Sequence, residues 1–180
     1  SIMGLHNMNT TKITGSIRFE DKEIVGMTND EMDRIRGSRI GMIFQDPLAA
    51  LNPLQRVGDQ VKECLDIHTD LSEEDKKKEV LELLDGVGIV NPQRTYRQFP
   101  HELSGGMRQR IMIAMAIACK PELIIADEPT TALDVTIQAQ ILDLLRKIQH
   151  ENHAGIIMIT HDLGVVAETA DRVAVMYAGQ

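Results

Sequence analysis

The feature that most limits how this chain can fold is the apolar run Leu123–Ala126, which follows a proline-containing turn and ends in two acidic residues. A strand without alternating polar residues is buried on both faces, and such strands are typical of parallel sheets covered by helices. A second apolar run, Ile156–Thr160, predicts a second buried strand. Between them, Val135–Gln149 has apolar residues at helical spacing. The succession of strand, helix and strand therefore predicts an α/β fold with helical crossovers.

The remaining elements extend this pattern towards both ends of the chain. A short helix at Leu163–Thr169 and a final strand at Arg172–Tyr177 complete a β-α-β-α-β second half. Nearer the start, Ser16–Phe19 alternates apolar and polar residues as a half-buried strand does, and Ile40–Phe44 predicts another strand. The first residues, Ser1–Asn7, are expected to be the end of a helix.

The middle of the chain is predicted to be helical. One helix is expected at Val57–His68, and another after Ser72, which can cap a helix whose first turn is acidic. The strongly apolar stretch Leu103–Cys119 predicts a third, buried helix. We therefore expect a single domain over residues 1–180, with a sheet portion at 1–45 and 117–180 and a helical subdomain at 46–116.

Composition and charge narrow the classes of function. With 43% hydrophobic and 26% charged residues over 180 positions, the chain can form one folded core. Its formal net charge of -8 argues against sequence-independent binding of nucleic acid. No stretch approaches the roughly 18 apolar residues that cross a bilayer, so contact with a membrane would come through a partner. Cys64 and Cys119 lack metal-ligand spacing and suit a reducing cytoplasm.

Two acidic residues, Asp127 and Glu128, directly follow the strand Leu123–Ala126. Ligands of open α/β sheets bind at the carboxyl ends of strands. One carboxylate there can hold Mg²⁺ beside a nucleotide, and its neighbour can orient or deprotonate a water. Taken alone, the pair is equally well a solvated strand end.

The sequence Leu103–Met107 (LSGGM) predicts a helix start that is open to a phosphate. Ser104 is a good N-cap, and Gly105 and Gly106 allow close backbone approach. Free N–H groups and the positive end of the helix dipole would face an anion. The alternative is a plain capped helix.

Polar side chains also follow two other predicted strands. His161 closes the strand Ile156–Thr160 and can donate a hydrogen bond to a γ-phosphate. Gln45 closes the strand Ile40–Phe44, where its amide can ligate Mg²⁺ or hold an attacking water. A lone histidine is more often structural, so neither residue identifies a site by itself.

Together these motifs resemble the ABC ATPase family in their order and approximate spacing. The resemblance covers essentially the whole chain and implies a RecA-like P-loop NTPase core, here incomplete, with an inserted helical subdomain. It assigns roles to residues of five motifs. Gln45 is the Q-loop glutamine, Leu103–Met107 the signature, Ala132–Asp134 the D-loop and His161 the switch histidine. In the fifth motif, Asp127 is the Walker B magnesium residue and Glu128 the general base.

The residues around these motifs are similar to those of the dipeptide and oligopeptide importer ATPases, a subfamily that also includes nickel and glutathione importers. The similarity rests on Gln45–Pro53, Pro100–Glu102 and Thr130–Thr136. It implies hydrolysis of ATP with Mg²⁺, coupled to peptide uptake across a membrane. The ATPase does not touch the transported solute, so the sequence leaves peptide, nickel and glutathione open.

The P-loop motif G-x-x-x-x-G-K-[ST], whose N–H groups and lysine cradle phosphates, occurs nowhere in the 180 residues. Ser1–Leu5 resembles the later part of the helix that follows this loop in the family. We therefore expect that the chain is truncated after the P-loop and beyond Gln180, and that it is inactive alone. Loss of the central strand that feeds the P-loop would leave unpaired backbone and exposed apolar surface, so we expect marginal stability or self-association.

The same resemblance implies a set of partners. Two ATPase subunits, identical or different, would sandwich two ATP molecules, each between one P-loop and the signature of the other subunit. Transmembrane permease subunits and, indirectly, a substrate-binding protein complete the set, with no nucleic acid. The implied location is the cytoplasmic face of the cell membrane, as a peripheral subunit. Two alternatives remain: a soluble ABC ATPase not tied to transport, and a non-hydrolysing binding or regulatory module.

Overall fold

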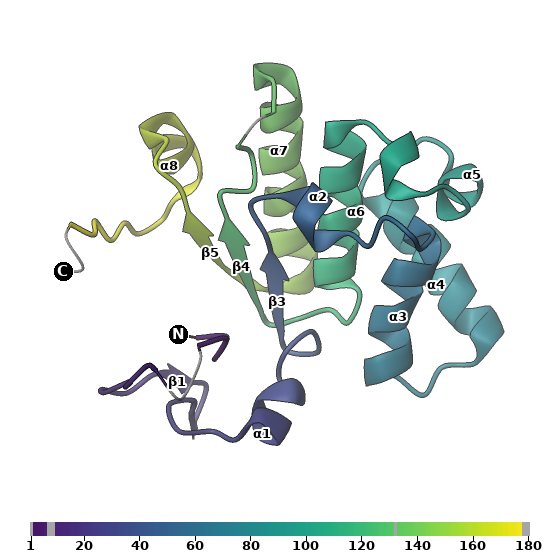
Figure 1. Cartoon of the computed structure of the whole chain (residues 1–180). Helices are drawn as coiled ribbons and strands as arrows, with labels where there is room; N and C mark the ends of the chain where they lie inside the picture. Colours follow the sequence, from purple (N-terminus) through teal and green to yellow (C-terminus); the bar gives the residue numbers. More distant parts are fainter. Residues whose placement is uncertain (1, 7–9, 132, 178–180) are drawn as a thin grey trace.

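The computed structural model describes residues 2–6, 10–131 and 133–177 (Figure 1). Its centre is a parallel sheet whose strands are, in spatial order, β3 (Ile40–Ile43), β4 (Leu123–Asp127) and β5 (Gly155–Ile159). The register pairs Ile43 with Ala126 and Asp127 with Ile159. All three carboxyl ends therefore meet at one edge of the sheet, uppermost in Figure 1. The parallel α/β sheet expected from the sequence is confirmed.

Helices lie against the sheet and beside it (Figure 1). Their bounds are α1 (Asn29–Asp33), α2 (Pro47–Ala50), α3 (Val57–His68), α4 (Glu73–Gly86), α5 (Pro92–Tyr96), the 3₁₀ helix η1 (Pro100–Glu102), α6 (Gly105–Ile117), α7 (Val135–Asn152) and α8 (Leu163–Thr169). Helices α3 and α8 begin and end where the sequence predicted.

Within the described ranges, no helix is long and apolar enough to cross a membrane. The division into a sheet portion and a helical subdomain remains a proposal.

Local sequence determines where two of these helices begin. The Ser72 hydroxyl accepts a hydrogen bond from the backbone N–H of Asp75 at 3.2 Å, which caps α4 as predicted. Ser104 caps α6 in the same way, accepting from the N–H of Met107 at 3.3 Å. Each cap satisfies one of the N–H groups that the first turn of a helix leaves without a partner.

The main core fills the space between the sheet and helices α3, α4, α6 and α7. Among its fully buried members are Ile43, Val61, Leu84, Ile111, Ile124 and Ile141. A smaller cluster covers part of the opposite face of the sheet and consists of Ile24, Met32, Ile35, Ile40 and Ile125. Burial of each such side chain stabilises the fold by about 1.5–3 kcal/mol, so both faces of β4 are anchored.

The prediction that the strand near Ile156–Thr160 is buried on both faces is wrong. Ile156 and Met158 pack against the main core, but Ile157 and Ile159 are 40% and 49% exposed. Within the described part of the chain, β5 pairs only with β4. It is therefore an edge strand with one open face, which agrees with the expected exposure of apolar surface on the sheet.

The strand predicted at Arg172–Tyr177 is also absent from the structure. This segment leads away from the sheet (Figure 1), and Val173, Val175 and Tyr177 are 61%, 86% and 84% exposed. A strand needs a neighbour that supplies its ladder hydrogen bonds. Among the described strands none lies beside this segment.

The structure differs from prediction near the start of the chain as well. The half-buried strand expected at Ser16–Phe19 is reduced to β1 (Arg18–Phe19), which forms an antiparallel hairpin with β2 (Lys22–Glu23). The sequence reading missed β2 because its two residues are both charged and carry no apolar alternation. Residues 2–6 contain turns instead of the expected end of a helix, while Ser1 and Asn7 lie outside the described residues.

Candidate functional site

Polar side chains from all three strand ends meet at the carboxyl edge of the sheet. Gln45 follows β3, Glu128 follows β4 and His161 follows β5. The amide Nε2 of Gln45 donates a hydrogen bond to Oε2 of Glu128 at 2.9 Å. Nδ1 of His161 lies 3.1 Å from Oε1 of the same carboxylate. The structure thus brings together the three residues that the sequence named as candidate catalytic groups, with Glu128 at the centre.

The backbone of Glu128 has an unusual conformation. Its φ angle is 46°, in the left-handed region that residues other than glycine seldom adopt. The backbone N–H of Glu128 donates to the carbonyl of Ile159 at 2.9 Å, which ties the residue to the end of β5. Left-handed conformations cost on the order of 1–3 kcal/mol and persist where the surrounding structure holds them, often at functional sites. The left-handed conformation therefore occurs at the residue whose side chain is the centre of the cluster.

The structure adds a fourth residue, Thr131, that sequence reasoning did not single out. Its hydroxyl donates to Oε2 of Glu128 at 2.8 Å, and its backbone N–H donates to the carbonyl of Glu128 at 3.1 Å. The two residues are the ends of a four-residue turn that contains Pro129, a favoured residue at its second position. The sequence Glu-Pro-Thr-Thr is typical of such a turn, and it was the signal that could have predicted a hydroxyl beside this carboxylate.

Hydrogen bonds favour the ionised form of the Glu128 carboxylate. The hydroxyl of Thr131, followed by His161, holds the pKa of Glu128 below that of an ordinary glutamate. The side chain is 24% exposed, so water can reach it. An ionised, water-accessible carboxylate is the form that can accept a proton.

Asp127 occupies the last position of β4 and is half-buried. Together with the amide oxygen of Gln45 it offers oxygen donors, the ligand type that Mg²⁺ prefers. Within the described ranges, no group of three or more His, Cys, Asp or Glu side chains could hold a metal ion. The donor set fits Mg²⁺ that is held by one carboxylate together with substrate phosphates, and it does not fit a closed metal cage.

The residues of the predicted signature form a second, separate cluster at the start of α6. A pocket of about 440 Å³ is lined by Ser104, Gly105, Gly106, Met107, Arg110, Leu133, Asp134 and Ile137. A Cβ at Gly105 would meet nothing within 4 Å, so the backbone is open there. The first N–H groups of this 13-residue helix suit an anion.

Asp134 lies in the same pocket but has a structural role too. Its Oδ1 accepts a hydrogen bond from the N–H of Ile137 at 3.0 Å and so caps α7. Gly106 lies close to the same helix, because a Cβ there would be 3.0 Å from Cγ2 of Ile137. Leu133 and Asp134 therefore sit beside the signature, while Ala132, the first residue of the predicted D-loop, lies outside the described residues.

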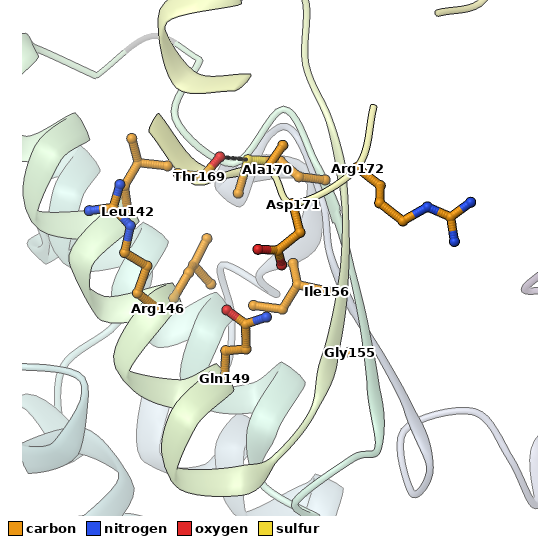
Figure 2. Close-up of a pocket in the computed structure, with 11 residues that line it drawn as sticks. Leu142, Arg146, Gln149, Gly155, Ile156, Thr169, Ala170, Asp171 and Arg172 are labelled. Atoms are coloured by element: carbon orange, nitrogen blue, oxygen red, sulfur yellow. Dashed lines mark hydrogen bonds between the residues drawn. The ribbon is translucent and has the colours of Figure 1, made fainter. Parts of the chain in front are cut away.

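A further pocket of about 340 Å³ lies between α7, β5 and the segment after α8 (Figure 2). Gln149 and Asp171 face each other across it, whereas Arg172 points away. Arg146, on its wall, already forms ion pairs with Asp143 and Glu168. The pocket contains none of the candidate site residues.

The chain resembles a well-defined set of known proteins. A family model described as ABC transporter matches residues 2–131. The oligopeptide transport ATP-binding protein OppD of Lactococcus lactis subsp. cremoris is 63% identical over 180 residues, which are 100% of this chain and 53% of the relative. The dipeptide transport ATP-binding protein DppD of Bacillus subtilis is 56% identical over 181 residues, 100% of this chain and 54% of the relative. The chain thus spans about half the length of these curated relatives.

Comparison with solved structures leads to the same family as the sequence comparisons. A dimeric post-hydrolysis state of the ATP-binding cassette MJ0796 bound to ADP and Pi superposes with a TM-score of 0.75 at 32% sequence identity. The match covers 84% of this chain and 65% of that chain. The α/β fold described above is therefore that of an ATP-binding cassette.

Proposed function

Because this chain belongs to the ABC transporter family, we propose that it provides the hydrolytic and signature residues of an ATPase subunit that powers peptide uptake. The observation that carries the proposal is the convergence of Gln45 and His161 on the carboxylate of Glu128. Relatives that are 56–63% identical are named oligopeptide and dipeptide transport ATP-binding proteins, which favours peptides as the transported solute.

In this proposal each residue of the strand-end cluster has one task. Glu128 accepts a proton from the attacking water, and His161 donates a hydrogen bond towards the γ-phosphate. Asp127 and the Gln45 amide oxygen would hold Mg²⁺, which neutralises phosphate charge when bound. Both Gln45 and His161 are exposed and can therefore turn from Glu128 towards a ligand.

The signature cluster has a different task. Ser104, Gly105 and Gly106 would contact the phosphates of an ATP molecule through the open start of α6, with Asp134 beside them. The pocket that they line shares no residue with the Glu128 cluster. Two separate clusters on one chain fit a composite site, in which each ATP is enclosed by two subunits.

The proposed partners follow from this arrangement. They are a second ATPase subunit, identical or different, and transmembrane permease subunits at the cytoplasmic face of the cell membrane, with a substrate-binding protein acting through the permease. Leu48 of α2 and Leu54 just after it are 59% and 85% exposed close to Gln45 in the chain. They provide apolar surface on which a permease helix could dock. A helix docked there would lie near Gln45 and could respond to nucleotide binding at the strand-end cluster.

Uptake of labelled solutes tests the proposal. These 180 residues would be joined to a P-loop segment of the family and assembled with peptide-permease subunits in vesicles. We expect ATP-dependent uptake of a labelled oligopeptide that Glu128→Gln abolishes and Glu151→Gln, at the exposed end of α7, leaves intact. Uptake of nickel or glutathione in place of peptide would overturn the substrate assignment. Uptake of no solute, with ATP hydrolysis retained, would favour a soluble ABC ATPase that is not tied to transport.

A further inference from the structure

Two hydrogen bonds tie Thr131 to Glu128, and both lie within one turn of the chain. The backbone bond from the N–H of Thr131 to the carbonyl of Glu128 closes the turn at 3.1 Å. The side-chain bond from the Thr131 hydroxyl to Oε2 of Glu128 spans 2.8 Å. Pro129, buried inside the turn, restricts the backbone between the two ends. The hydroxyl is therefore held against the carboxylate by local structure alone.

The other two partners of Glu128 come from elsewhere in the fold. Gln45 belongs to the loop after β3, and His161, whose side chain is 77% exposed, belongs to the loop after β5. In the proposed function both must leave the carboxylate, Gln45 for the metal and His161 for the γ-phosphate. The Thr131 contact is the one that need not change when a nucleotide binds.

The two oxygens of the carboxylate are not equivalent. Oε2 accepts hydrogen bonds from Thr131 and Gln45, whereas Oε1 faces His161. Once His161 turns away, Oε1 is left without a side-chain partner among those described, while Oε2 keeps the hydroxyl. The hydrogen bond of Thr131 thus restrains Oε2 and leaves Oε1 as the oxygen without a local partner.

We propose that Thr131 is a positioning residue that fixes Oε2 of Glu128 and leaves Oε1 as the atom that accepts the proton of the attacking water. This inference rests on the proposed hydrolytic function. In the reaction, the water oxygen bonds to the γ-phosphorus as the bond to the bridging oxygen breaks and its electron pair leaves with ADP. The proton of the water goes to Oε1. Alignment of the base with the water matters because small displacements of reacting groups reduce rates strongly.

The chain offers a matched set of substitutions for a test. Thr131→Val removes the hydroxyl and keeps the shape, and Thr131→Ser keeps the hydroxyl. Thr131 is exposed, so neither change creates a buried cavity. Thr69→Val is the control, because the Thr69 hydroxyl also forms a local bond, to the carbonyl of Leu65 at 2.7 Å, in the helical region. Thr131→Ala replaces the valine variant if circular dichroism shows that the latter is unfolded.

The first readout is steady-state ATP hydrolysis by the subunit in which these residues are joined to a P-loop. We expect Thr131→Val to lower kcat about tenfold with KM changed less than about twofold, because the nucleotide contacts are untouched. Thr131→Ser should retain at least about half of kcat, and Thr69→Val should match the unsubstituted protein. An unchanged kcat in Thr131→Val, or equal losses in the valine and serine variants, would overturn the proposal.

The second readout does not depend on activity. Crystal structures of the nucleotide-free chain are compared in a background where Gln45→Ala and His161→Ala remove the other two partners of Glu128. They should show the Glu128 carboxylate in its present orientation in Thr131→Ser and rotated or divided between orientations in Thr131→Val. The same single orientation in both variants would contradict the positioning role. If Glu128→Gln leaves hydrolysis intact, the proposed function fails instead, and the crystal structures still decide whether Thr131 positions the side chain.

Discussion

Gly41 in β3 lies directly against the backbone of Ala116 in α6: a Cβ at Gly41 would be 2.3 Å from the carbonyl oxygen of Ala116. This contact lets the signature helix pack on the same sheet whose edge carries Glu128. The approach is too close for any side chain other than hydrogen, since real Cβ atoms do not come within 3.0 Å of backbone atoms. The position of α6, and with it the signature, therefore depends on a glycine in a strand.

Replacement of Gly41 by alanine should consequently destabilise the fold. We expect Gly41→Ala to lower the free energy of unfolding by about 1–3 kcal/mol, as overpacked cores do. Gly86→Ala, at the end of α4, is the control, because a Cβ there meets nothing within 4 Å. It should change stability by less than about 1 kcal/mol. Urea unfolding followed by circular dichroism measures both, and similar values for the two variants would show that the close approach is unimportant.

Ion pairs between α3 and α4 should make stability depend on pH. Nζ of Lys62 lies 2.7 Å from Glu73, and Nζ of Lys76 lies 2.8 Å from Asp66. These lysines lower the pKa values of Asp66 and Glu73 below their ordinary values. Because the folded-state pKa values are the lower ones, the stabilisation is present above about pH 4.5 and is lost as the pH falls through them.

Thermal unfolding at a series of pH values tests this network. The transition temperature should fall between pH 6 and pH 3, and the fall should be smaller by a few degrees in the double variant Asp66→Asn, Glu73→Gln. Asp143→Asn is the control, since its partner Arg146 retains Glu168. Identical pH profiles for the double variant and the unsubstituted chain would mean that these exposed pairs contribute nothing measurable.

The open face and free edge of β5 should make the 180-residue chain self-associate. Ile157 and Ile159 are exposed on this strand, and β5 pairs only with β4 in the described part of the chain. Exposed apolar edge strands pair readily with other chains. Sedimentation velocity should show concentration-dependent association that the double variant Ile157→Thr, Ile159→Thr reduces. Ile67→Thr, at a 68% exposed position on α3, should leave it unchanged. A strictly monomeric chain at micromolar concentration would refute this expectation.

The elements with strong local signals were predictable from the sequence. Ser72 marked the start of α4 and Ser104 that of α6, because capping hydroxyls act within a few residues. The run Leu123–Ala126 indicated a strand buried on both faces, and the structure confirms it. The bounds of α3 and α8 were also correct.

The errors concern strands whose state depends on distant partners. The apolar residues Ile156–Ile159 predicted burial on both faces, yet one face is open. Arg172–Tyr177 predicted a strand, yet none of the described strands pairs with this segment. At the site, too, contacts that depend on the folded arrangement were harder to predict than the positions of single residues. Placement of Gln45, Glu128 and His161 at strand ends predicted their meeting, but the Thr131 hydroxyl was found only through the turn geometry.

The most direct test of the site is the Glu128→Gln substitution in the subunit that joins these 180 residues to a P-loop, with Mg-ATP binding and hydrolysis measured side by side. We expect binding within about twofold of the unsubstituted protein and hydrolysis reduced by at least about 100-fold, the usual contribution of a general base. Glu151→Gln, at the far end of α7, should alter neither. Hydrolysis by Glu128→Gln within a few-fold of the unsubstituted rate would show that the strand-end carboxylate is not the base and would contradict the assignment of the site.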